Sequence, residues 1–310
     1  MKSVTEFTDA AASSSTASFD YTEAFSRNLG LLTPAEQERL RRAHVAIAGL
    51  GGVGGVHAQA LARVGIGSFS LADFDRFEVA NMNRQVGATV DTLGRPKVDV
   101  MAESLVAINP EIRLRLFPAG IDERNVGDFL AGASAAIDGI DFFCMQARRL
   151  LFQKARRQGI PALTAAPAGF GATLHVFTPE GMSFDRYFDF RDTMGPPEQL
   201  LQFVLGLAPK RAHAAYFPAT AVDLEARRAP SLAPGCYLAA ALVATEVVNL
   251  ILGRRPVKAA PYFFQFDPFV QIYKRGRLRR GNRGSLQRLK KWWVLRTNPE
   301  LRRLIRPTGS

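Results

Sequence analysis

A glycine-rich run, GLGGVGG at residues 49–55, is the feature that most constrains how this chain can fold. The apolar run VAIA precedes it at 45–48, and HAQALARVG follows it at 57–65 with apolar residues at helical spacing. Absent Cβ atoms let backbone N–H groups and a helix N-terminus approach an anion. The stretch therefore predicts a strand, a tight turn and a helix that together bind a nucleotide phosphate. The glycines expected at that phosphate are Gly49, Gly51, Gly52 and Gly54.

Strand-like and helix-like segments alternate along the chain. Apolar runs predict strands at 69–72, 112–117, 135–138, 161–165 and 173–177. Helical spacing and start signals predict helices at 34–42, 97–108, 125–130 and 146–157. This alternation favours an α/β fold, a doubly wound, Rossmann-like, mostly parallel sheet with helices on both faces.

Composition divides the chain into parts. Residues 1–20 are rich in Ser, Thr and Ala without apolar periodicity, and we expect a disordered leader there. Residues 21–273 are expected to form one nucleotide-binding domain. Inside it, residues 178–232 form a long irregular crossover segment that we expect to be a lid or to bind substrate. A buried helix at 235–252 and closing strands at 262–273 complete the domain.

The positive charge is confined to the basic tail, residues 274–310. This tail holds thirteen Lys and Arg against one Glu, a balance that equals the net charge of +12 of the whole chain. Only the tail is therefore expected to attract an acidic partner. Either it forms a basic amphipathic helix that contacts RNA or an anionic lipid surface, or its tryptophans pack back on the body.

The cysteines and the apolar runs exclude several classes of protein. Cys144 and Cys236 have neither metal-ligand spacing nor a disulfide framework, so we expect no zinc and a reducing compartment. Both are interpreted as small hydrophobic residues. Apolar runs stop well before the length of a bilayer span, and no basic-then-apolar signal pattern opens the chain. We therefore expect a cytoplasmic protein without a transmembrane segment.

Residues 71–85, LADFDRFEVANMNRQ, follow the glycine turn by about twenty residues, where dinucleotide folds place a ribose-binding carboxylate. The turn alone predicts NAD or FAD, and a dehydrogenase as the default. A hydride-transfer site does not need the cations and amides that follow Asp73, whereas cleavage of a triphosphate does. Arg84 and Lys97 supply charge, with Asn81 and Gln85 as neutral donors. Asp141, just past the strand at 135–138, is suited to hold Mg²⁺.

The ordered set of motifs resembles the ThiF/MoeB family of ubiquitin-activating-enzyme-like adenylyltransferases over roughly residues 22–178. It consists of GLGGVGG, DFDRFEVANMNRQ, GRPKVDVMAES, INPEIRL and IDGID with Arg148 after it. The resemblance implies that ATP and Mg²⁺ are bound and that a substrate carboxylate attacks the α-phosphate, giving an acyl-adenylate and pyrophosphate. A candidate acceptor is the C-terminal glycine of a small ubiquitin-like or sulfur-carrier protein.

The resemblance also implies roles for individual residues. Asp73 would bind the ribose hydroxyls, and Asp75 would support the loop. Phosphate contacts would come from Asn81, Arg84 and Lys97, while Asp141 would hold Mg²⁺. Arg27 resembles an arginine that the family inserts from the partner subunit, which implies a homodimer.

Some residues depart from the family pattern. Phe142 stands where members usually have Asn, paired CxxC motifs are missing, and residues 178–232 contain no Cys. We therefore expect no structural zinc and no thioester step. Two alternatives stay open, a tRNA-modifying ATP-dependent dehydratase of the same family and a non-catalytic nucleotide-binding scaffold.

Overall fold

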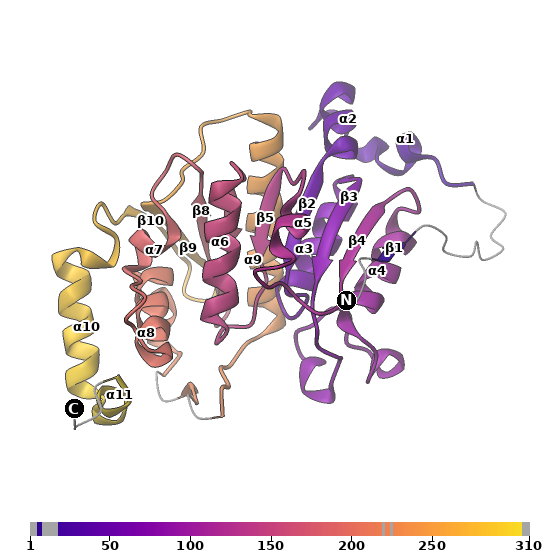
Figure 1. Ribbon diagram of the computed structural model, residues 1–310. Helices are drawn as coiled ribbons and strands as arrows, with labels where there is room; N and C mark the ends of the chain where they lie inside the picture. Colours follow the sequence, from indigo (N-terminus) through magenta and orange to yellow (C-terminus); the bar gives the residue numbers. More distant parts are fainter. Residues whose placement is uncertain (1–4, 8–17, 219–220, 224–225, 306–310) are drawn as a thin grey trace.

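Five parallel strands form the centre of the sheet in a computed structural model that describes residues 5–7, 18–218, 221–223 and 226–305. Their order across the sheet is β4-β3-β2-β5-β6 (Figure 1). The strands are β4 Arg113–Phe117, β3 Ser68–Ala72, β2 His44–Ala48, β5 Ala135–Asp138 and β6 Ala162–Thr164. The chain direction across the sheet reverses between β2 and β5. Ligands of open α/β sheets bind at such a reversal, outside the carboxyl ends of the strands.

Helices cover both faces of this sheet, as predicted (Figure 1). Three share one apolar core: α3 Gly54–Arg63, α4 Lys97–Ile108 and α9 Ala233–Leu252. The opposite core is formed by α5 Val126–Leu130, α6 Met145–Arg157, α7 Phe184–Phe188 and α8 Pro196–Leu207. Within the described residues, α9 alone is long and apolar enough to cross a membrane. It packs against α3 and β8, and 56% of its apolar stretch is buried, which is typical of a core helix.

Antiparallel strands extend the sheet at both ends. Beyond β6 lie β8 Gly171–Phe177, β9 Tyr262–Asp267 and β10 Ile272–Arg277, with β7 Pro167–Ala168 paired to β8. At the other end, β1 Thr5–Phe7 pairs antiparallel with β4. The expectation of disorder throughout residues 1–20 is thus wrong for 5–7, because the open edge of β4 offers backbone partners that composition does not reveal. Residues 1–4 and 8–17 lie outside the described part of the chain.

The crossover segment is more regular than the sequence predicted. It contains α7, whose N-terminus is capped by the Ser183 side chain, and α8, which begins at Pro196. Aromatic residues of these helices pack together, with the Phe188 and Phe203 rings 5.0 Å apart. The prediction of an irregular 178–232 segment was wrong for these residues because contacts with α6 and β8 stabilise short helices that are weak alone.

The basic tail continues as β10 and then as two helices, α10 Ser285–Thr297 and α11 Pro299–Ile305. α10 packs against α8, at the end of the sheet far from β1 (Figure 1). Buried amides hold it there: Asn282 Nδ2 donates to the Gln202 carbonyl oxygen at 2.7 Å, and Gln287 Nε2 donates to that of Leu205 at 2.8 Å. The tail therefore packs back on the body, although through amides rather than tryptophans.

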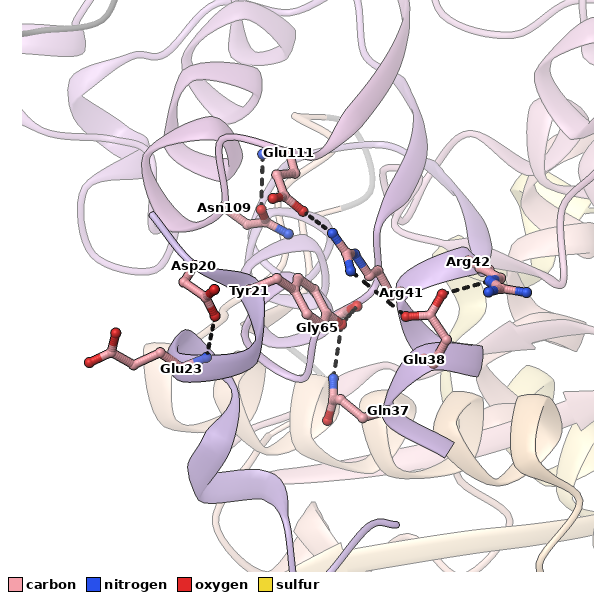
Figure 2. A network of polar contacts seen from close by, with 10 residues as sticks. All are labelled: Asp20, Tyr21, Glu23, Gln37, Glu38, Arg41, Arg42, Gly65, Asn109 and Glu111. Atoms are coloured by element: carbon pink, nitrogen blue, oxygen red, sulfur yellow. Dashed lines mark hydrogen bonds and ion pairs between the residues drawn. The ribbon is translucent and has the colours of Figure 1, made fainter. Parts of the chain in front are cut away.

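The N-terminal segment of the domain is fixed at the far end of α3. It comprises α1 Tyr21–Ala24, the 3₁₀ turn η1 Ser26–Asn28 and α2 Pro34–Arg42, which has the expected Thr33–Glu36 capping box. Figure 2 shows its polar network. The Tyr21 hydroxyl donates to the Gly65 carbonyl oxygen at 2.6 Å and accepts from Gln37 Nε2 at 2.9 Å. These contacts set the position of Arg27, one residue into η1.

Candidate functional site

The glycine turn touches the end of the neighbouring strand β5. Gly49 has φ +85°, and a Cβ there would lie 2.2 Å from the Gly139 carbonyl oxygen. A Cβ on Gly54 would lie 1.8 Å from the Gly49 carbonyl oxygen, so neither position accepts a larger residue without backbone movement. Gly49, Gly51 and Gly52 line the main cavity, whereas Gly54 packs behind them. No side chain of the described residues caps α3, which leaves its first N–H groups available to an anion.

Asp73 follows β3 directly and is tied to the glycine turn. Its Oδ2 accepts from the backbone N–H of Leu50 at 2.6 Å, and its Oδ1 accepts from that of Asp75 at 2.8 Å. Burial raises the pKa of the Asp73 carboxyl. It lines the cavity beside the turn, where the remaining lone pairs of the carboxylate can accept from hydroxyl groups of a ligand.

Lys97 is the first residue of α4, and its buried ammonium lies at the cavity wall. Its Nζ donates to Asp75 Oδ2 at 3.0 Å, while its backbone N–H donates to the Asp75 carbonyl oxygen at 2.9 Å. Asp75 is thus bonded to Lys97 twice. The Lys97 side chain is 7% exposed and that of Asp75 is 50% exposed, so the ion pair holds the ammonium in a fixed position at the cavity wall.

Arg84 and Gln85 lie against the glycine turn from the loop after β3. The Arg84 Cγ is 3.6 Å from where a Cβ of Gly52 would be, and its Nη1 donates to the Ala80 carbonyl oxygen at 2.9 Å. Gln85 Nε2 lies at the same distance, 3.6 Å, from a Cβ built on Gly51. The buried Gln85 Oε1 has no hydrogen-bond partner among the described residues, which leaves it available to a ligand.

Besides Gly54, two predicted site residues do not line the cavity. Asn81 Oδ1 accepts from the backbone N–H of Glu78 at 3.0 Å, so it caps its own turn and does not line the cavity. Arg27 is exposed near the C-terminal end of α3, where Asn28 contacts Val64. Ten residues of helix separate that end from the glycine turn, about 15 Å. Arg27 therefore lies outside the site of its own chain.

Asp141 lies in the loop after β5 and lines the cavity. Its Oδ1 accepts from the backbone N–H of Phe143 at 3.0 Å. Arg148 of α6 holds this loop from below: it donates to the carbonyl oxygens of Ile140 and Asp141 and to Asp138 Oδ2, the last at 2.7 Å. The Arg148 guanidinium lies over the Phe203 ring, 4.6 Å from its centroid. These contacts hold the loop in place even though Phe142 departs from the family pattern.

The donor set fits Mg²⁺ bound mainly through a nucleotide. Asp138 Oδ2 accepts from Arg148, and Asp141 Oδ1 accepts from Phe143. Asp141 Oδ2 is therefore the carboxylate oxygen that forms no hydrogen bond among the described residues. No group of three or more metal-binding side chains occurs within the described part of the chain. One carboxylate is nevertheless compatible with Mg²⁺, which usually keeps waters and takes its other ligands from substrate phosphates.

Both thiols lie beside the site, and both are poorly ionised. Burial and the nearby Asp141 raise the pKa of Cys144, at the start of α6. Burial also raises the pKa of Cys236 in α9, whose Sγ lies 3.2 Å from where a Cβ of Gly52 would be. Thr173 of β8 was not predicted, although its buried Oγ1 lines the cavity without a partner among the described residues. No motif marks it, because only the folding of β8 against β6 brings it there.

Known proteins of similar sequence match about half of this chain. The chain is 38% identical to the tRNA threonylcarbamoyladenosine dehydratase of Haemophilus influenzae over 151 residues, which is 48% of this chain and 57% of that protein. It is 34% identical to the sulfur carrier protein ThiS adenylyltransferase of Escherichia coli over 143 residues, 46% of this chain and 56% of that protein. The chain thus spans little more than half the length of these relatives.

The fold matches that of solved structures. The crystal structure of PaaA superimposes with a TM-score of 0.63 at 22% sequence identity, covering 88% of this chain and 78% of that one. This likeness confirms the predicted α/β fold with a large sheet flanked by helices. The sequence profile of the ThiF family matches residues 25–286. The chain therefore belongs to the ThiF family.

Proposed function

We propose that this protein is an ATP-dependent adenylyltransferase that activates a carboxylate as an acyl-adenylate and releases pyrophosphate. The observation that carries this proposal is that Arg84, Lys97 and Asp141 line one cavity together with the glycine turn. A nucleotide held by that turn would have two cations and a carboxylate beside its phosphates. Relatives that carry out adenylylation support the same reaction.

The proposed chemistry is an in-line displacement at the α-phosphorus. An oxygen of the acceptor carboxylate forms a bond to that phosphorus, and the bond to the bridging oxygen breaks, so pyrophosphate leaves. Backbone N–H groups of the turn and the Asp73 carboxylate bind the nucleotide. Lys97, fixed by Asp75, and Arg84 stabilise the negative charge that grows on the α-phosphate and on pyrophosphate. Mg²⁺, held by Asp141, would supply further charge neutralisation on the phosphate oxygens.

A pyrophosphate-exchange assay tests this function. Wild-type protein, ATP, Mg²⁺, labelled pyrophosphate and synthetic peptides that end in Gly-Gly should give exchange. Lys97→Ala should lower the exchange rate by about 100- to 1,000-fold, the usual effect of losing one preorganised charge donor. The matched control is Lys154→Ala, which removes a lysine of α6 that pairs with Glu123. Absence of exchange in the wild type, or full exchange after Asp141→Ala, would contradict the proposal.

The acyl group is proposed to pass on without a thioester. Raised pKa values of Cys144 and Cys236 disfavour the thiolate that such a step needs. The two thiols also lack metal-ligand and disulfide spacing, which supports the proposal of a cytoplasmic protein without zinc.

The active unit is proposed to be a homodimer in which Arg27 serves the partner's site. Arg27 is exposed and about 15 Å from its own glycine turn, as reasoned from the length of α3, so it can reach a nucleotide only in a second copy. Mixing Arg27→Ala with Lys97→Ala tests this. Each variant alone should be inactive, whereas the mixture should recover about one quarter of wild-type activity, because half the dimers are mixed and each has one intact site. No recovery would contradict the proposal.

A second candidate function is ATP-dependent modification of tRNA. Both the dehydratase among the relatives and the positive charge of residues 274–310 favour it. Exchange or ATP hydrolysis that requires tRNA, and that no peptide carboxylate supports, would identify this function. ATP binding without any exchange would instead identify a non-catalytic scaffold.

A further inference from the structure

The cavity is far larger than a nucleotide site. It has a volume of about 2010 Å³ and runs from the glycine turn, past α8, to the C-terminal helices α10 and α11. Small-molecule sites usually occupy about 300–1,000 Å³. A nucleotide at the glycine end would therefore leave at least half of this volume for a second, extended ligand.

The far wall of the cavity is an addition to the family domain. The match to the ThiF family ends at residue 286, one residue into the first turn of α10. Lys290, Trp293 and Val294 of α10 line the cavity beyond that point, and so do Leu301 and Leu304 of α11. Trp293 and Leu304 remain 48% and 50% exposed, so this wall presents apolar surface that the described part of the chain does not cover.

Arg211 and Lys290 line this wall without a counter-ion among the described residues, and Lys210 lies close to Lys290. Arg303 of α11 lines the same cavity. Lys210, Arg211 and Lys290 form no ion pair with any carboxylate of the described residues. Burial lowers the pKa of Lys290, and repulsion from Lys210 and Arg211 lowers it further. Like charges placed together cost free energy, which an anionic ligand would recover. We call Lys210, Arg211 and Lys290 the cationic cluster.

Arg211 is also held in a strained backbone conformation. Its φ of +48° lies in the left-handed region, which is uncommon for a residue with a side chain. Its guanidinium lies 5.7 Å from the Trp293 ring centroid. Such strain concentrates where a binding or catalytic site requires a fixed side chain. The Arg211 charge and the apolar Trp293 ring therefore lie side by side at the cavity.

We propose that α10, α11 and the cationic cluster form a recognition wall for an acidic, partly apolar polypeptide segment of the acceptor. This inference rests on the proposed adenylation, because the segment would lead its own carboxylate along the cavity to the glycine turn. An acidic side chain of the segment would pair with the cationic cluster, and apolar side chains would contact Trp293 and Leu304. The wall thus selects which carboxylate is activated.

The lining favours a polypeptide over RNA. Apolar side chains of α8, such as Leu200 and Val204, line the cavity together with those of α10 and α11. Glu300 adds a carboxylate to the same wall. RNA binding usually depends on a continuous basic track with aromatic stacking platforms. Mixed apolar lining with a compact cluster of cations is instead suited to an acidic peptide.

Fluorescence anisotropy with three labelled probes tests the recognition wall. The probes are a dodecapeptide of alternating Glu and Leu with a free carboxyl terminus, the same peptide with Gln for Glu, and a single-stranded RNA of twelve nucleotides. The acidic peptide should bind at least tenfold more tightly than the Gln peptide. The double variant Arg211→Gln, Lys290→Gln should lose at least tenfold of that affinity. Thermal unfolding checks that the variant is folded, and Arg211→Gln alone serves where it is not.

Arg288→Gln, Arg296→Gln is the matched control, because it removes two cations from α10 that do not line the cavity. It should change affinity for the acidic peptide by less than twofold. An equal loss in this control, tighter binding of RNA at the cationic cluster, or no preference for the acidic peptide would each overturn the recognition wall. Binding of a fluorescent ATP analogue by the wild type is measured separately. Its absence would overturn the proposed function, whereas its presence without peptide binding would overturn the wall alone.

Discussion

Replacing Arg148 with methionine would leave the Asp138 carboxylate buried without its cation. The Arg148 and Asp138 side chains are 4% and 1% exposed, and their ion pair spans 2.7 Å. Removing one partner of such a pair costs about 3–5 kcal/mol, since the other charge stays buried and unpaired. Methionine also loses the contact of the guanidinium with the Phe203 ring and the hydrogen bonds to the Ile140 and Asp141 carbonyl oxygens, so the measured loss includes these as well as the unpaired charge. The free energy of unfolding from urea titrations measures it.

A double-mutant cycle isolates this effect. Arg148→Met together with Asp138→Asn removes both charges, so the double variant should be more stable than Arg148→Met alone by at least about 1 kcal/mol. Arg157→Met changes an exposed arginine near the end of the same helix and should lie within about 0.5 kcal/mol of the wild type. A cost below about 1 kcal/mol for Arg148→Met, or a double variant no more stable than the single, would refute the reasoning.

Three further changes have defined outcomes. Burial lowers the pKa of His57 to about 3, so in acid the unfolded chain binds a proton that the folded protein excludes. His57 therefore contributes a loss of stability as pH falls below about 6.5, about 2 kcal/mol at pH 5. His57→Phe should remove that share in urea titrations at pH 7.5 and 5, whereas His175 and His44, whose pKa values burial also lowers, keep theirs. Gly54→Ala should abolish binding of a fluorescent ATP analogue, because its Cβ would lie 1.8 Å from the Gly49 carbonyl oxygen. Gly127→Ala should not, because α5 leaves room for a Cβ at that position. Asp75→Asn should lower pyrophosphate exchange less than Lys97→Ala, because the ammonium remains but is held less firmly; equal losses would contradict this.

Local sequence predicts the end of the cavity that the glycine turn forms. The glycine-rich run predicts close backbone approach at this turn, and the structure adds that Gly49 has a positive φ. Asp73 was predicted by its distance from that turn and Lys97 by its charge and its place in the ordered motifs, and both line the cavity. Asn81 was predicted by the same spacing, yet it caps its own turn, because an amide bonds whichever backbone group is nearest. Spacing therefore brings a residue to a loop without fixing where its side chain points.

The far wall of the cavity, formed by α10 and α11, could not be predicted in this way. Whether Lys290 faces solvent or a cavity depends on how α10 lies against α8, and that docking depends on the buried amides Asn282 and Gln287. Amides do not contribute to apolar periodicity, so the pattern that predicts the buried face of a helix does not indicate that they are buried. The same contact turns part of the basic tail toward the cavity and leaves Arg288 and Arg296 on its outside. The positive charge of the tail, which is continuous in sequence, is thus divided between the cavity and the outer face of α10. Under the proposed recognition, only the cations that face the cavity affect which carboxylate reaches the glycine turn.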